Sequence, residues 1–202
     1  MSFFDNLFGD PADSTVPLET EPPAGTYIRA ELEGENALCG WTDSPNGEWL
    51  ALYTCDPPQR VALVRGEDGQ FMYELGPPDA MAVSDTGRLA VVTGDDQDKL
   101  YVFDTSGDPL VQQTYDEPLL DGTISADGQY SAVVTAGGRI ELLDVTAGER
   151  VGTTTTPASV AMPSLGFGTV GGDPVVTISD EERDELVESV RIKRLRETDG
   201  HH

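Results

Sequence analysis

Carboxylates are the side chains that could do chemistry in this 202-residue chain, because aspartate and glutamate number 37 and histidine occurs only as His201 and His202. Those two histidines are either native or the remainder of a purification tag. A Ser–His–Asp or Cys–His relay therefore has no base inside the fold. Two cysteines, Cys39 and Cys55, do not make a tetrahedral zinc set without histidine. We predict no catalytic residues and no cofactor.

Two groups of aspartates are weak candidates for holding a metal ion. One lies in a short acidic turn, and the other follows three similar strands: Asp95, Asp96 and Asp98, and Asp43, Asp85 and Asp127. Calcium loops need spaced oxygen ligands and a glycine at the bend, so a solvated loop is favoured for the first group. The second group could surround an ion at a channel mouth, although outward-facing turn residues are favoured.

The elements that position these residues come from an internal repeat. The segments 43–52, 83–92 and 123–134 resemble one another, and their turn glycines, Gly47, Gly87 and Gly128, lie 40 and 41 residues apart. Self-similarity at this period is typical of repeat architectures. Each repeat alternates apolar and polar residues in four short runs separated by glycine-containing turns, which predicts four antiparallel strands. Four strands per 40 residues indicate a blade of a β-propeller.

We predict blades at about 37–76, 79–116, 119–156 and 158–200. The fourth is degenerate: Val160–Met162 and Pro174–Ile178 are its predicted first strands, with the glycine-rich stretch 166–172 as a loop between them. Ser179 and Glu182 form a capping box, which predicts a short helix over 180–188, and 191–200 would be the third strand. One helix over 180–197 is the alternative.

The fourth blade lacks a last strand, and a spare strand, Tyr27–Glu33, precedes the first blade. We predict that this N-terminal strand completes the last blade, pairing with Val190–Arg196 and placing its basic residues beside Glu31, Glu33 and Glu35. Such closure removes exposed sheet edges. The predicted fold class is therefore all-β: a small four-bladed β-propeller closed by its N-terminal strand, within residues 25–200.

The stretch Trp41–Ala51, Trp-Thr-Asp-Ser-Pro-Asn-Gly-Glu-Trp-Leu-Ala, resembles the repeat of TolB-like and YVTN-like β-propellers. The Gly-His and Trp-Asp dipeptides of WD40 blades are missing. The resemblance implies a propeller that serves as a scaffold, an adaptor or, less often, an enzyme. Such propellers usually have six or seven blades, so half of an eight-bladed ring formed by a homodimer, or an incomplete arc, is the alternative architecture.

The charge balance restricts the environment and the partners. Thirty-seven acidic residues against 12 basic ones give a net charge of −25. This acidic, lysine-poor composition resembles that of haloarchaeal proteins, whose charge is screened by molar salt; an acidic mesophilic protein is the alternative. The recurring apolar strands argue against disorder. The negative field repels phosphate, so nucleic acid is not an expected partner.

The segment 1–24 is proline-rich and acidic, which predicts a flexible tail. Its aromatic tip could dock in a partner's groove or fold back on this chain: Phe3, Phe4, Leu7 and Phe8. We expect no secretory signal and no membrane span, and hence a cytoplasmic protein. Cys39 and Cys55 would lie on neighbouring strands, either as a disulfide or as two small buried residues in a reducing cytosol.

These observations predict a non-enzymatic scaffold or adaptor that binds an unidentified protein partner in a high-salt cytoplasm, as a monomer or homodimer. The alternative is a divalent-cation-dependent binder or hydrolase that uses carboxylates at the channel mouth of the propeller.

Overall fold

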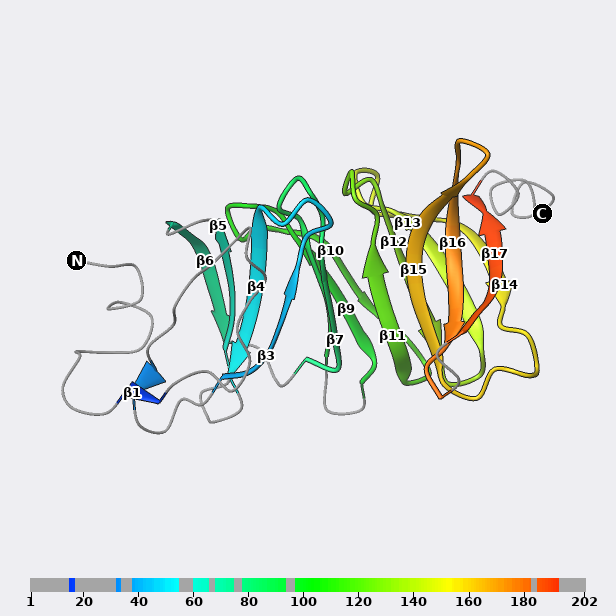
Figure 1. Ribbon diagram of the computed structural model, residues 1–202, viewed down its shortest axis with the longest axis horizontal. Helices are drawn as coiled ribbons and strands as arrows, with labels where there is room; N and C mark the ends of the chain where they lie inside the picture. Colours follow the sequence, from blue (N-terminus) through cyan, green and yellow to red (C-terminus); the bar gives the residue numbers. More distant parts are fainter. Residues whose placement is uncertain are drawn as a thin grey trace.

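The structure, a computed structural model, consists of β-sheets stacked side by side (Figure 1). It describes residues 15–16, 32–33, 38–54, 60–65, 68–74, 78–93, 97–182 and 185–192. Three of its sheets have four strands and a fourth has three, and all their neighbouring strands are antiparallel. The all-β prediction is confirmed, and each of the first three predicted repeats forms one sheet.

The strands of each sheet follow one another in chain order. The first sheet contains β3 (Leu38–Asp43), β4 (Trp49–Thr54), β5 (Arg60–Arg65) and β6 (Asp68–Glu74). The second contains β7 (Ala80–Val83), β8 (Leu89–Thr93), β9 (Lys99–Phe103) and β10 (Pro109–Thr114). The third contains β11 (Leu119–Ile124), β12 (Tyr130–Thr135), β13 (Arg139–Asp144) and β14 (Glu149–Thr155). The fourth contains β15 (Pro163–Val170), β16 (Asp173–Asp180) and β17 (Glu185–Arg191).

Glycines make the tight turns between first and second strands, as the repeat predicts. Gly47, Gly87 and Gly128 have φ angles of 70°, 79° and 71°. Side chains with a Cβ rarely adopt this left-handed conformation, so glycine recurs at the same place in each repeat.

The core lies between successive sheets rather than in one central cluster. Trp49 and Leu63 of the first sheet pack with Leu89 and Phe103 of the second. Val92 and Val102 of the second sheet belong to the cluster that continues into the third. Residues of β12 and β13 pack with Val176 and Ile178 of β16. The middle strands of the second and third sheets are therefore apolar on both faces, because each face meets a different neighbouring sheet.

The first strands bring the sheets together in sequence order. β3 and β4 contact β7, β7 and β8 contact β11, and β11 and β12 contact β15. No packing of similar extent joins the first sheet to the fourth within the described residues, and Figure 1 shows these two sheets at opposite ends of the row. The structure is therefore an arc of four propeller-like blades.

The predicted N-terminal closing strand is not found where the structure describes it. Within Tyr27–Glu33, only β2 (Leu32–Glu33) is described, and it pairs with β1 (Thr15–Val16). β17 pairs with β16. Arg191, predicted to face N-terminal glutamates, instead lies with its Nη1 atom 3.7 Å from Oδ2 of Asp173, on the strand with which β17 pairs. Figure 1 shows β1 and β17 at opposite ends of the row, so the described part of the predicted closing strand does not reach β17. The rest of the predicted pair, 27–31 with 193–196, lies outside the described residues.

The fourth repeat is more regular than the sequence predicts. The predicted first strand, Val160–Met162, precedes the observed β15, and the glycine-rich stretch expected as a loop is mostly this strand, with its turn at Gly171 and Gly172. The helix predicted over 180–188 is wrong, as is its longer alternative, because β17 occupies 185–191. Cross-strand pairing buries Val190 opposite Val176, and this tertiary contact overrides the local helix-start signal.

Cys39 is disulfide-bonded. It lies at the irregularity in the β3–β4 pairing, between Leu38 and Gly40, and is exposed, so the interpretation of Cys39 as a buried apolar residue is wrong. Cys55, the other cysteine of the chain, lies outside the described residues. Across the part of the chain that the structure describes, no helix has the length and hydropathy that a membrane span requires.

Candidate functional site

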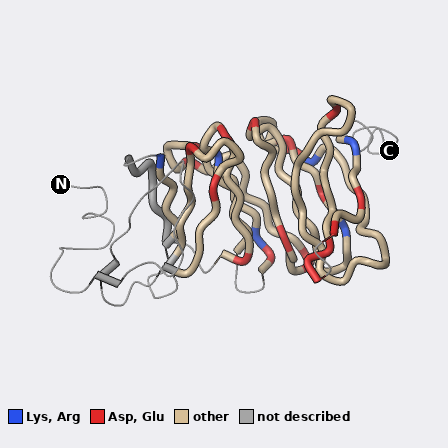
Figure 2. Tube along the Cα trace, viewed as in Figure 1, with Lys and Arg blue, Asp and Glu red and all other residues tan. Residues whose placement is uncertain are grey.

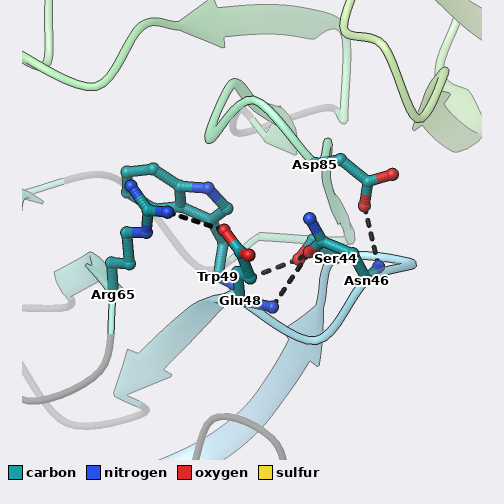
Figure 3. Close-up of polar contacts among 6 residues, drawn as sticks. All are labelled: Ser44, Asn46, Glu48, Trp49, Arg65 and Asp85. Carbon is teal, nitrogen blue, oxygen red and sulfur yellow. Dashed lines mark hydrogen bonds and ion pairs between the residues drawn. The ribbon is translucent and has the colours of Figure 1, made fainter.

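The turns after the first strands are built to one plan. In the first, the backbone N–H of Trp49 donates to Oγ of Ser44, 3.0 Å away, while that hydroxyl donates to Oδ1 of Asn46 at 2.7 Å (Figure 3). In the third, the N–H of Tyr130 donates to Ser125 Oγ at 2.9 Å, and the hydroxyl donates to Asp127 Oδ1 at 2.6 Å. A buried serine thus fixes each turn, as serine and asparagine do in many tight turns.

Hydrogen bonds also join each turn to the next, across sheet boundaries. The N–H of Asn46 donates to Oδ1 of Asp85 at 2.8 Å (Figure 3). The N–H of Asp85 donates to the carbonyl of Ala126 at 2.8 Å, and the Arg88 guanidinium donates to the carbonyl of Gly128 at the same distance. Three turns spaced 40 residues apart therefore form one continuous surface, which we call the turn face.

A cavity of about 570 Å³ opens beside the turn face. Residues from all four sheets line it, so the row of blades must curve around it. Its apolar lining includes side chains from every sheet: Pro45, Ala82, Val83, Ile124, Tyr130, Phe167, Pro174 and Ile192. A concave, largely apolar hollow with a few polar groups is the usual form of a binding site.

The polar groups of the cavity are acidic or neutral. Asp43 and Asp127 line it together with the amide side chain of Gln129, and no lysine or arginine is among the described lining residues. Asp and Glu residues gather mainly in the turns at the ends of the strands (Figure 2). The cavity therefore presents apolar walls beside a carboxylate rim, which complements a positively charged group.

The structure places the predicted metal candidates apart or in other roles. Asp85 accepts the bond from Asn46, and Oδ1 of Asp127 accepts from the Gln129 N–H at 2.9 Å as well as from Ser125. The carbonyl of Asp98 accepts from the N–H of Tyr115. Among the described residues, no three Asp, Glu, Cys or His side chains cluster as metal ligands would. Asp95 and Asp96 lie outside the described residues.

One carboxylate that sequence reasoning missed joins the third sheet to the fourth. Asp121 Oδ2 accepts from the N–H of Leu165 at 2.6 Å and from Ser164 Oγ at 3.2 Å, and its Oδ1 accepts from the N–H of Gly122. Burial raises the pKa of Asp121, and these hydrogen bonds oppose that shift. No turn motif marks this residue in the sequence, because Ser164 and Leu165 lie over 40 residues away.

An ionic cluster around one buried carboxylate lies at the junction of the second and third sheets. Glu141, 3% exposed, has its Oε1 3.2 Å from Nε of Arg139 and 3.9 Å from Nη1 of Arg150. Burial raises the pKa of the Tyr115 phenol, and the negative charge of Glu141 raises it further. None of these residues is among the described residues that line the cavity.

Sequence reasoning also missed most of the apolar cavity lining. Phe167 belongs to the stretch interpreted as a loop, and Tyr130 and Pro174 were assigned only to strands. For Tyr130 and Pro174, the position at the start of a strand was the available signal, whereas Phe167 lies within β15. The predicted partner-binding residues Phe3, Phe4, Leu7 and Phe8 lie outside the described residues, as do His201 and His202.

The arrangement of sheets and turns defines the fold as a β-propeller. Among solved structures, the chain is similar to the β-propeller domain of Cps50 (Swd1) from Myceliophteria thermophila, with a TM-score of 0.52 and 12% sequence identity. The match covers 79% of this chain and 56% of that one, so the chain spans little more than half of that domain. No protein-family model and no curated protein sequence matches the chain.

Proposed function

We propose that this chain is a non-enzymatic β-propeller interaction module. The cavity beside the turn face would bind a protein segment that presents one apolar side chain next to a lysine or arginine. The observation that carries the proposal is the lining: apolar side chains from four sheets surround one hollow, with Asp43 and Asp127 among them. The hollow could bury an apolar side chain while the carboxylates meet its basic neighbour.

The rigidity of the turn face supports this role. Cross-sheet bonds from Asn46 to Asp85, and from Asp85 to Ala126, hold three of the contributing sheets in one geometry. A preorganised surface loses less entropy on binding than one assembled from loose loops. Scaffolds with loops on a rigid frame commonly bind partners in this way.

The proposal includes the environment and the oligomeric state. We infer a TolB-like or YVTN-like propeller of haloarchaeal type that acts as a monomer in a cytoplasm with molar salt, with no nucleic acid or membrane as partner. The net charge of −25 supports this, because such a charge is tolerated best where salt screens it. At high salt the apolar side chain would supply most of the affinity, and the basic group would supply selectivity.

The test uses short synthetic peptides with a central phenylalanine flanked by lysines, serines or glutamates. Fluorescence anisotropy should show that the lysine-flanked peptide binds at least about tenfold more tightly than the glutamate-flanked one, a difference of about 1.4 kcal/mol. The variant Gln129→Arg adds a positive charge to the lining and should weaken binding of the lysine-flanked peptide about tenfold.

The matched control is Gln112→Arg, which adds the same charge at an exposed position of β10, outside the cavity lining. It should bind the peptides as the parent chain does. Equal weakening by both variants would indicate a general charge effect and contradict a site in the cavity. A midpoint of unfolding that shifts with calcium or magnesium at fixed ionic strength would favour the alternative, a cation-dependent binder or hydrolase.

A further inference from the structure

The first sheet has an apolar face that points away from the second sheet. In the strand register, Leu50 lies opposite Val64, and Leu52 lies opposite Trp41 and Ala62, so these five side chains share one side. The alternate residues of the same strands pack against the second sheet. We call the side that carries these five residues the outer face of the first sheet.

This outer face is buried although no described strand outside its own sheet packs on it. Leu50 and Val64 are 0% exposed, Leu52 is 3% and Ala62 is 4%. The apolar cluster that they form has described members from the first sheet only. Side chains in the middle of a sheet face remain accessible unless another layer covers them. Within the described residues nothing supplies that layer.

The N-terminal segment is the one with the right origin and length. β1 (Thr15–Val16) pairs with β2. Since β2 ends at Glu33 and β3 begins at Leu38, this pairing holds β1 near the start of the first sheet. Figure 1 shows β1 at the first-sheet end of the row. The fourteen residues before β1 can span about 46 Å when extended, and a six-residue strand is about 20 Å long.

The same segment has the apolar side chains that such a cover requires. Phe3, Phe4, Leu7 and Phe8 fall within six residues. Of the other undescribed stretches near this sheet, 55–59 and 66–67 hold no large apolar residue and 75–77 holds Leu75. The stretch 17–31 holds Leu18, Tyr27 and Ile28, which are fewer large apolar side chains than in 1–14 and are spread over eleven residues. Burying three phenylalanines and a leucine removes more apolar surface from water than any of these stretches could.

We propose that residues 1–14 cap the outer face of the first sheet, with Phe3, Phe4, Leu7 and Phe8 packed against Leu50, Leu52 and Val64. The cap takes the place that a neighbouring blade occupies on the other sheets. The aromatic tip then belongs to the chain's own surface rather than to a partner's groove.

Trp41 provides a direct readout, because it lies on the outer face and the chain has only one other tryptophan, Trp49. In the Trp49→Phe background, Trp41 is the sole tryptophan emitter. Removing residues 1–14 should shift its emission to longer wavelength and increase acrylamide quenching about twofold or more. A synthetic peptide of residues 1–14 should reverse both changes when it is added to the shortened chain.

A second variant covers the case in which the shortened chain fails to fold. Replacing Phe4 and Phe8 with serine in the full chain should increase quenching in the same direction but less. The matched control, Asp10→Ser with Asp13→Ser, changes the same segment without its apolar residues and should leave Trp41 quenching unchanged. Circular dichroism identifies the folded variants. Unchanged Trp41 emission and quenching in folded chains that lack the four apolar residues would overturn the proposal.

Discussion

The two ends of the arc differ in chemistry. One end is the outer face of the first sheet, and the other is the outer face of the fourth. At the first sheet the outer face is apolar, with Leu50, Leu52 and Val64 buried. The fourth sheet turns Leu165, Val176 and Ile178 towards the third sheet, so its alternate residues form the outer face. Those are mostly small or polar: Gly166, Gly168, Thr177, Ser179 and Ser189. The exposed Val170 and Leu186 are also among them.

The polar end is suited to terminate the arc without a further layer. Ser189 is exposed and Thr177 is half-buried, while Val175 is the buried apolar residue among the described members of this face. Repeat proteins commonly end in a unit whose outer side is polar, since such a side needs no neighbour. The apolar end needs one. The difference agrees with the cap that we propose for the apolar end.

The same difference bears on the predicted eight-bladed ring of two copies. Ring closure would place the first-sheet outer face of one copy against the fourth-sheet outer face of the other. In our proposal the first of these faces is covered by the N-terminal segment of its own chain. The other offers mainly serine, threonine and glycine, with the exposed Val170 and Leu186 among them. Large obligate interfaces are more apolar than this, which favours the monomer in our proposal.

The largest difference in stability is expected when one side chain on each outer face is truncated to alanine. Leu50→Ala should reduce the free energy of unfolding by about 3–4 kcal/mol, because a fully buried leucine leaves a cavity in a covered layer. Thr177→Ala on the other outer face should cost less than about 1 kcal/mol. Urea unfolding in molar KCl measures both. A Leu50→Ala cost as small as that of Thr177→Ala would show that the first outer face is not covered.

A smaller difference in stability is expected between glycine substitutions in a turn at the middle of the arc and in one at its end. At Gly128 a Cβ would lie 2.6 Å from Oγ1 of Thr86 and 2.9 Å from Cδ of Arg88, both in the second sheet's turn. Gly128→Ala should therefore cost about 2–3 kcal/mol, from left-handed backbone strain together with a disturbed sheet junction. The same urea titration provides the measurement.

Gly172 is the matched control for the backbone part of this effect. Its φ is 88°, and no atom lies within 4 Å of the Cβ that would be added. Gly172→Ala should cost about 1–2 kcal/mol from strain alone. Equal costs at the two positions would mean that the contact between neighbouring turns contributes nothing to stability.

The first three repeats were predictable because their information is local. Glycine at a fixed place in each turn and alternating apolar residues around it, as at Gly87 and Leu89, specify a hairpin without reference to the rest of the chain. The structure confirms these strands and the propeller class. The cavity was not predictable in the same way, because Pro45 and Phe167 meet in it from sheets at opposite ends of the arc.

The errors concentrate where local and long-range signals disagree. Ser179 and Glu182 have the spacing of a helix start, but Val190 is buried by pairing with β16 and by packing on the third sheet. Propensity is too weak to oppose that burial. The predicted closing strand is tested only at Leu32–Glu33, which pairs with β1, because 27–31 and 193–196 lie outside the described residues. Charge complementarity between distant segments, such as Glu33 and Arg191, is worth little at an exposed edge.

The smallest contrast is between the carboxylates at two sheet junctions. Asp121 accepts three hydrogen bonds where the third sheet meets the fourth, whereas Asp85 accepts one from Asn46 at an exposed position. Asp121→Asn replaces one accepting oxygen with a donor facing a backbone N–H, and should cost about 1–2 kcal/mol at neutral pH. Asp85→Asn should cost less than about 0.5 kcal/mol.

The contribution of Asp121 to stability should depend on pH, and the direction of that dependence follows from its pKa. Burial raises the pKa of Asp121 in the folded chain. The folded state therefore binds more protons than the unfolded state between the two pKa values, and stability from Asp121 decreases as the pH rises through that window. The unfolded value is near 3.8, so the parent chain should exceed Asp121→Asn in stability by more at pH about 4 than at pH about 7. If the excess instead grows with pH, the hydrogen bonds from Leu165 and Gly122 outweigh burial, and this junction is held by its charged carboxylate.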